Sequence, residues 1–237
     1  MLLALWSPKG GSGTSVLAAS MALVLARGPA SGCRLADLDG DQPAIFGLGA
    51  EPELGLLDWL AAGPETPTEA LDRLAVEVAP GVALLPLGGP ASPLSARPEA
   101  AAGAALAVAL RDGPIPVVAD CGRAAEPASR AVAEVADATI VVVRGCYLTL
   151  RRAVRAPALA CTIGTALVEE PGRSLSRREV ADVLGLPVLA RVPFRDQVFR
   201  ALDAGVLPAR LPDALARAAS DLATRVGISS THRGAAA

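Results

Sequence analysis

Lysine is almost absent from this chain. Among the 22 lysine and arginine side chains in 237 residues, only Lys9 is a lysine. Lysine is a compact point charge on a flexible stem, whereas arginine is a rigid planar fork, so the two are not interchangeable. A single lysine inside a glycine-rich segment therefore suggests a task that arginine performs poorly.

Aromatic residues are also scarce, at 3% of the chain, although hydrophobic residues make up 52%. The core must therefore be aliphatic, and a chain of this length can bury one large α/β core. A net charge of −2 argues against a strongly DNA-binding domain but leaves a local basic patch open. No uncharged apolar run reaches about 18 residues, which argues against a transmembrane segment.

Signatures of metal binding and of disulfides are missing as well. The cysteines Cys33, Cys121, Cys146 and Cys161 show no C-x-x-C spacing, and the only histidine is His232. A zinc site is therefore not expected. Scattered thiols in an α/β chain fit a reduced cytosol, where they serve as small core residues.

A glycine-rich segment, PKGGSGTS at 8–15, lies between an apolar run and a helical-looking stretch. The order strand, glycine-rich turn, helix is the setting of a phosphate-binding loop. Glycines allow a tight turn that points backbone N–H groups at an anion, and the helix N-terminus adds its positive dipole end. Ser15 stands where such loops bind Mg²⁺. A glycine-rich turn that binds nothing is the plain alternative. The residues expected to contact nucleotide here are Lys9, Gly10, Gly11, Ser12, Gly13, Thr14 and Ser15.

The segment departs from the usual G-x-x-x-x-G-K-[ST] pattern, because Pro8 replaces the first glycine and Thr14 replaces the lysine. It resembles the deviant Walker A loop, K-G-G-x-G-K-T, of the MinD/ParA family. In that family an early lysine reaches the partner's phosphates across an ATP-sandwiched dimer, and Lys9 holds this position. Thr14 stands where the second lysine of this loop usually lies. In this substitution the sequence resembles the pilus-localisation branch called CpaE or TadZ, of which it matches the ATPase domain only. The resemblance covers nearly the whole chain.

Acidic residues follow two further apolar runs. Asp37 and Asp39 come after the second run, and Asp120 ends a later one. By resemblance to the family, Asp37 lies in the outer shell of Mg²⁺, Asp39 is catalytic and orients the attacking water, and Asp120 holds Mg²⁺ through water. A carboxylate beside a metal-bound triphosphate can position water. Without the resemblance, residues 39–43 are good turn material, and an apolar run with one acid is weak evidence for a Walker B strand.

A late segment extends the resemblance. Residues 183–205 are similar to the family segment that lies beside the adenine, which places Pro193, Phe194 and Arg195 near the base. An ordinary strand, turn and helix would give the same pattern.

Apolar runs alternate with helical stretches along the chain. The runs lie near 1–6, 33–37, 82–87, 115–119, 138–143, 164–168 and 187–191. This alternation predicts an α/β protein with a mostly parallel, doubly wound sheet of about seven or eight strands between helices. With the resemblance, the prediction is a three-layer P-loop NTPase fold. We expect one domain over 1–228 and a flexible tail at 229–237.

The resemblance implies an ATP-binding, Mg²⁺-dependent switch that forms a homodimer on ATP binding. Such switches position pilus, division or DNA-partition machinery with a protein partner, here unknown. They are cytoplasmic and are recruited to the pole, the membrane surface or the nucleoid. A lysine at position 14 would donate a charged hydrogen bond to phosphate, worth roughly 1.5–3 kcal/mol. With Thr14 instead, ATP would bind about 10- to 150-fold more weakly. Hydrolysis is then weak or partner-stimulated. A non-hydrolysing scaffold or localisation protein is the alternative.

Two surfaces leave alternatives open. Arginines near 151–155 and 173–178 could bind DNA weakly, as ParA-type proteins do, or belong to solvated helix faces, because acidic residues interleave with them. The last helix, near 211–226, could target a membrane as in MinD. Its few bulky apolar residues and its lack of lysine favour packing against the sheet.

Overall fold

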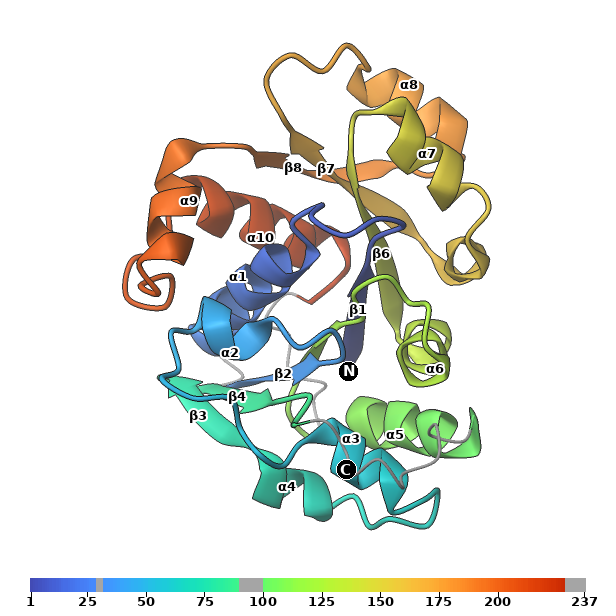
Figure 1. Ribbon diagram of the computed structural model, residues 1–237. Coiled ribbons are helices and arrows are strands. Elements are labelled where there is room, and N and C mark those ends of the chain that lie inside the picture. The colour runs from blue at the N-terminus through green and yellow to red at the C-terminus, as the bar shows by residue number, and fades with distance from the viewer. Residues whose placement is uncertain (29–31, 90–99, 229–237) are drawn as a thin grey trace, which may run out of the picture.

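The computed structural model describes residues 1–28, 32–89 and 100–228. These residues form one eight-stranded sheet with helices on both of its faces (Figure 1). The strands are β1 (Leu2–Trp6), β2 (Cys33–Asp37), β3 (Val76–Ala79), β4 (Val82–Leu85), β5 (Val117–Asp120), β6 (Ala138–Arg144), β7 (Gly164–Glu169) and β8 (Val188–Pro193). The helices are α1 (Thr14–Ala26), α2 (Gln42–Ile45), α3 (Leu56–Ala61), α4 (Ala70–Leu74), α5 (Ala100–Asp112), α6 (Pro127–Val135), α7 (Tyr147–Ala153), the 3₁₀ helix η1 (Pro157–Cys161), α8 (Arg177–Leu184), α9 (Asp196–Asp203) and α10 (Asp213–Arg225).

The strand order is β3-β4-β2-β5-β1-β6-β7-β8, and every pair is parallel except β3 with β4. The predicted α/β architecture with a mostly parallel sheet is therefore confirmed. β1 lies in the middle of the sheet. Strands β2 to β5 lie on one side of it, and strands β6 to β8 lie on the other. Open parallel sheets bind ligands at the carboxyl ends of their strands, at the point where the order reverses. Here that point is the carboxyl end of β1.

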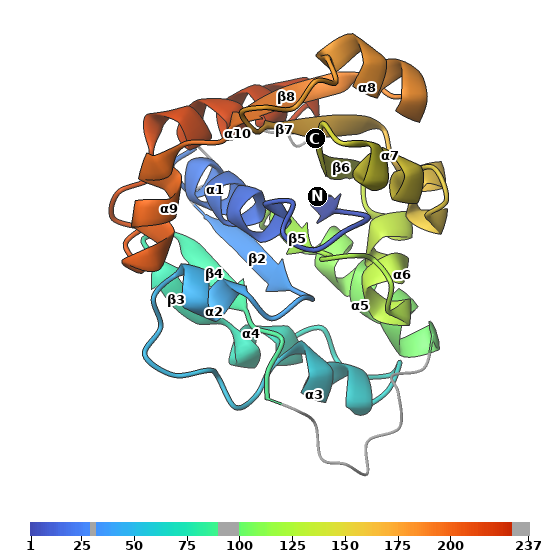
Figure 2. The same cartoon turned by 45° about the horizontal axis from the view of Figure 1, so that its top comes forward.

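The central strands are apolar on both faces because helices cover both. Leu3 and Leu5 of β1 pack on one side with α1 and α10. Leu2, Ala4 and Trp6 pack on the other side with α5 and α6. Figure 2 shows α1, α9 and α10 across the sheet from α5 and α6. Buried parallel strands read as continuous apolar runs for this reason, which is why these strands could be located in the sequence.

The edge strand β3 was not predicted. It pairs antiparallel with β4 after a turn in which Gly81 has φ +75°. Its first three residues are only partly buried or exposed. A four-residue edge strand with one covered face carries too short an apolar pattern to be recognised. The predicted tail at 229–237 lies outside the described residues.

The helix expected near 211–226 is observed as α10. Its Leu215 and Leu222 are buried, and the helix packs against α1 and β8. Its apolar side is therefore occupied within this chain. Among the described residues, no helix combines the length and apolarity needed to cross a membrane.

Candidate functional site

The glycine-rich segment forms a loop between β1 and α1. Gly11 has φ +73° and Gly13 has φ +90°, a left-handed conformation that favours glycine. The hydroxyls of Ser7 and Ser12 both donate to the Lys9 carbonyl oxygen at 2.8 Å, so the loop's own serines fix its turn. The Lys9 side chain is exposed.

The N-terminus of α1 is suited to an anion. Gly13 caps the helix without a side-chain hydrogen bond, and the first turn contains no acidic residue. The N–H groups of that turn therefore have no side-chain acceptor, and the helix dipole adds partial positive charge. A helix that starts in this way after a glycine-rich loop is a site for phosphate.

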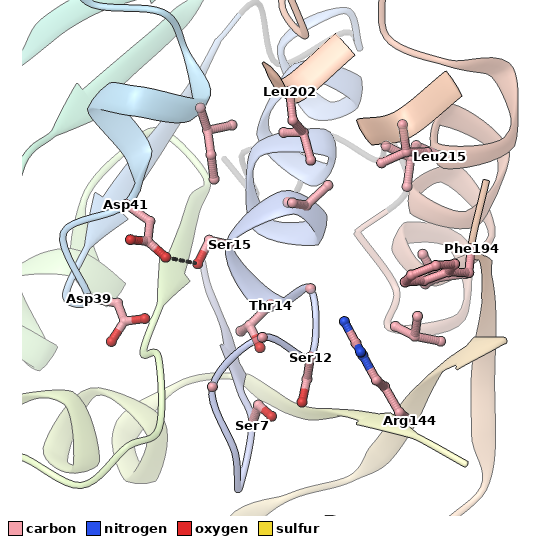
Figure 3. Close-up of a pocket in the computed structure, with 18 of the residues that line it drawn as sticks. Ser7, Ser12, Thr14, Ser15, Asp39, Asp41, Arg144, Phe194, Leu202 and Leu215 are labelled. Carbon is pink, nitrogen blue, oxygen red and sulfur yellow. Dashed lines mark hydrogen bonds between the residues drawn. The ribbon is translucent and has the colours of Figure 1, made fainter. Parts of the chain in front are cut away.

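Thr14 and Ser15 open α1 and are both buried beside the loop. The Ser15 hydroxyl donates to Asp41 Oδ2 at 3.4 Å, as Figure 3 shows. Hydroxyl and carboxylate oxygens are ligands that Mg²⁺ accepts, usually together with water and phosphate. Asp41 was not singled out in the sequence, where residues 39–43 were turn material only in the alternative interpretation. It adds a carboxylate to the predicted metal site.

Asp37 and Asp120 lie side by side beneath the loop. They are register partners at the ends of β2 and β5, and both are fully buried. Asp37 accepts from three backbone N–H groups, those of Gly40 at 2.7 Å, Gln42 at 3.0 Å and Asp39 at 3.1 Å. Burial, and then repulsion from Asp120, raise the pKa of Asp37 to about 7. Burial raises the pKa of Asp120 to about 6.

Gln42 connects these carboxylates to the loop helix. Its amide nitrogen donates to Asp120 Oδ2 at 2.8 Å and to the Ser15 carbonyl oxygen at 3.1 Å. Its Oε1 is buried and has no partner among the described residues. Two crowded carboxylates and an unsatisfied amide oxygen fit a nearby hydrated cation, which would stabilise all three. No motif in the sequence indicated this role, because it depends on a contact between distant segments.

Asp39 lies above this pair, at the cavity wall. Its carboxylate contacts Gly122, where an added Cβ would come within 2.2 Å of Asp39 Oδ1, and Gly122 has φ +52°. Partial burial, and then repulsion from Asp41, raise the pKa of Asp39, while Arg123 opposes the shift. Only glycine at 122 therefore allows Asp39 its position.

A cavity of about 450 Å³ joins these groups to the end of β8. Its polar end contains the loop from Lys9 to Ser15, together with Asp39 and Asp41. Its other wall includes Pro193, Phe194 and Arg195. The Phe194 ring meets the Phe199 ring edge to face, with centroids 4.6 Å apart. The volume and the mixture of one polar end and one apolar wall suit a small ligand with a charged and a planar part.

The structure thus brings the predicted nucleotide-binding residues and Asp39 to one cavity, and Asp37 and Asp120 are buried next to its lining, where they accept from the N–H groups of Asp39 and Gly122. No group of three or more histidine, cysteine or acidic side chains that could hold a metal ion by itself is found within 1–28, 32–89 and 100–228. A Mg²⁺ ion here would need oxygens from phosphate or water, as is usual for magnesium with nucleotides.

The predicted arginine clusters lie away from this cavity's lining. Arg151, Arg152 and Arg155 are exposed on and just after α7. In the second cluster, Arg173 pairs with Glu170 at 2.7 Å and Arg178 with Asp182 at 3.8 Å. The second cluster is therefore partly neutralised by neighbouring acids.

Comparison with known proteins places the fold. No protein-family model matches the sequence, and no curated protein matches it. Among solved structures, a ParA family ATPase from Chlorobium tepidum is similar with a TM-score of 0.77 and 22% identity, over 94% of this chain and 97% of that one.

Two nucleotide complexes are also similar. The septum site-determining protein MinD from Pyrococcus horikoshii, complexed with Mg-ADP, has a TM-score of 0.75 and 18% identity, over 95% of each chain. A variant of McdA from Cyanothece, in complex with ATP, has a TM-score of 0.71 and 17% identity, over 98% of each chain. These likenesses establish that the chain has the fold of ParA, MinD and McdA.

Proposed function

We propose that this chain is a MinD/ParA-type protein that binds ATP with Mg²⁺ and works as a dimerising switch. One observation carries the proposal: the glycine-rich loop and the open N-terminus of α1 face the same cavity as Asp39, and the N–H groups of the lining residues Asp39 and Gly122 donate to the paired carboxylates of Asp37 and Asp120. A triphosphate and its cation need this combination of donors and acids. The shared fold with nucleotide-bound MinD and McdA supports it.

Each residue has a role in this proposal. The N–H groups of Gly10 to Ser15 hold phosphate oxygens. The Ser15 hydroxyl and Asp41 face the cation, and Asp37 and Asp120 hold its water ligands from below. The bound Mg²⁺ neutralises charge that develops on the phosphates. Pro193, Phe194 and Arg195 flank the base at the other end of the cavity.

Asp39 would orient the attacking water, because its carboxylate faces the cavity without an ion-pair partner among the described residues. The pKa of Asp39 is raised by burial but the group is open to the cavity, which suits a residue that accepts a proton or a hydrogen bond from water. Hydrolysis would be slow or dependent on a partner, since Thr14 replaces a lysine.

The experiment measures binding and turnover separately. Equilibrium binding of a fluorescent ATP analogue, with Mg²⁺ and with EDTA, should give an affinity that falls when Mg²⁺ is removed. Phosphate release by the wild type should then exceed that of Asp39→Asn by about tenfold or more. Absence of nucleotide binding by the wild type would end the proposal.

A non-hydrolysing localisation or scaffold protein is the second candidate, and Thr14 favours it. The two candidates differ in one result. Nucleotide binding with phosphate release equal in the wild type and in Asp39→Asn would identify the scaffold. Because of Thr14, we also place the protein nearest the CpaE/TadZ-like branch. We propose that it acts with a protein partner to position pilus, division or DNA-partition machinery.

A further inference from the structure

Arg144 is a cation in the cavity that the proposed roles do not use. It is the last residue of β6, which pairs in parallel with β1 so that Trp6 lies opposite Val141. β1 ends at Trp6, whereas β6 continues for three more residues, or about 10 Å. Arg144 therefore lies level with the glycine-rich loop, and its side chain lines the same cavity.

The Arg144 side chain is held by packing rather than by hydrogen bonds. Its Cζ lies 5.4 Å from the centroid of the Phe194 ring, a cation–π contact. Its Nη1 forms a long ion pair with Glu170 Oε1 at 3.7 Å, a separation that exceeds hydrogen-bond distance. The other Glu170 oxygen, Oε2, is bound to Arg173 at 2.7 Å, so Glu170 is shared between the two arginines.

The guanidinium group keeps donors for a ligand. Arg144 Nε is buried and has no hydrogen-bond partner among the described residues. Figure 3 shows the guanidinium pointing into the space between Phe194 and the loop at Ser12 and Thr14. Arginine can only donate, so these donors require an acceptor, and a phosphate group matches the planar fork.

We propose that Arg144 binds the phosphates of the nucleotide within its own chain and supplies the positive charge that Thr14 lacks. The inference rests on the proposed function. We expect Arg144 to bind phosphate and not the base. Phe194 covers one face of the guanidinium group, and the edge of the guanidinium group points toward the loop. Arginine on β6 thus replaces lysine in the loop.

The experiment compares Arg144→Gln with Arg191→Gln by competition against a fluorescent ATP analogue. Arg191 is the matched control, because it is an arginine on the edge strand β8 that pairs with Glu169 and does not line this cavity. Arg144→Gln should weaken ATP binding about 10- to 150-fold. Adenosine has no phosphate, so it should displace the fluorescent analogue equally well from the wild type and from both variants.

A second change tests whether the two positions share one task. Thr14→Lys introduced into Arg144→Gln should restore most of the ATP affinity. Arg144→Met, which keeps an apolar stem against Phe194, replaces Arg144→Gln in every comparison should the glutamine variant fail to fold by circular dichroism.

The outcomes separate this inference from the function on which it rests. A wild type that binds no ATP contradicts the proposed function itself. A wild type that binds ATP, with Arg144→Gln within about twofold of it, overturns the role of Arg144 alone. Equal losses for ATP and adenosine, or a double variant as weak as Arg144→Gln, would overturn it as well.

Discussion

Single residues decide what this loop can bind. The loop keeps Lys9 but has Thr14 at the position where a lysine usually contacts phosphate, so its charge must come from elsewhere. The contiguous motifs made Lys9, Thr14 and Ser15 recognisable in the sequence. Arg144 was not recognisable, because nothing near it in the sequence resembles a phosphate site. Only the pairing of β6 with β1 brings it to the loop.

The position of Asp39 depends on the absence of a side chain at Gly122. Gly122→Ala places a Cβ within 2.2 Å of Asp39 Oδ1 at a backbone φ of +52°, so it should displace Asp39 and lower phosphate release about tenfold or more. The left-handed backbone should also cost about 1–2 kcal/mol of unfolding free energy. A phosphate-release assay measures the rate, and urea unfolding measures the free energy of unfolding.

Gly185→Ala is the matched control. Gly185 has φ +65° at the end of α8, and nothing lies within 4 Å of an added Cβ. It should lose comparable stability with no change in phosphate release. Equal release from both variants would show that Asp39 tolerates the extra methyl group, contrary to the crowding described above.

At the scale of elements, the register of two strands creates the acidic pair. Asp37 and Asp120 are 83 positions apart (120 − 37), yet β2 and β5 set them opposite each other. Each carboxylate was visible in the sequence as the end of an apolar run. Their pairing and their link through Gln42 were not, because register between distant strands depends on the whole sheet. The edge strand β3 was missed for a related reason, since its stability comes from β4.

This pair predicts how stability depends on pH. The pKa of Asp37 rises from 3.8 to about 7 in the folded chain, and that of Asp120 rises from 3.8 to about 6. Between about pH 4 and pH 7 the folded state therefore holds more protons than the unfolded state. The free energy of unfolding should fall as the pH rises through this window.

Thermal unfolding in EDTA from about pH 4 to about pH 7 measures the effect. The midpoint should fall steadily with rising pH, and Asp120→Asn should reduce the slope, because it removes both an ionising group and the repulsion on Asp37. Mg²⁺ with a nucleotide should raise the midpoint most at the alkaline end. A midpoint that stays level across this range in EDTA would contradict the assignment of these pKa values.

For the whole molecule, the fold was predictable because its signals are strong and repeated. Long apolar runs alternate with helical stretches, and buried parallel strands leave little ambiguity. The surfaces were less predictable. The side chains of Lys9 and of the arginines at 151–155 are exposed, and none of them forms an ion pair with another of the described residues. Assembly therefore has to be tested in solution.

Lys9 is expected to control the assembly of two copies. If Lys9 reaches the phosphates bound by a second copy, Mg-ATP should double the mass seen by light scattering, whereas ADP should leave a monomer. Lys9→Ala should remain monomeric with Mg-ATP, since the bridging charge is lost. It should still bind ATP within about threefold of the wild type, because its loop glycines, Ser15 and Arg144 are unchanged.

Lys9→Arg and Arg27→Ala complete the comparison. Arg27 follows α1 at the end far from the loop, so its loss should not affect dimer formation. Arginine at position 9 keeps the charge but not the compact ammonium group, and we expect it to weaken the dimer less than alanine does. A Lys9→Ala protein that dimerises with Mg-ATP as fully as Arg27→Ala would show that the only lysine in this chain does not join two copies.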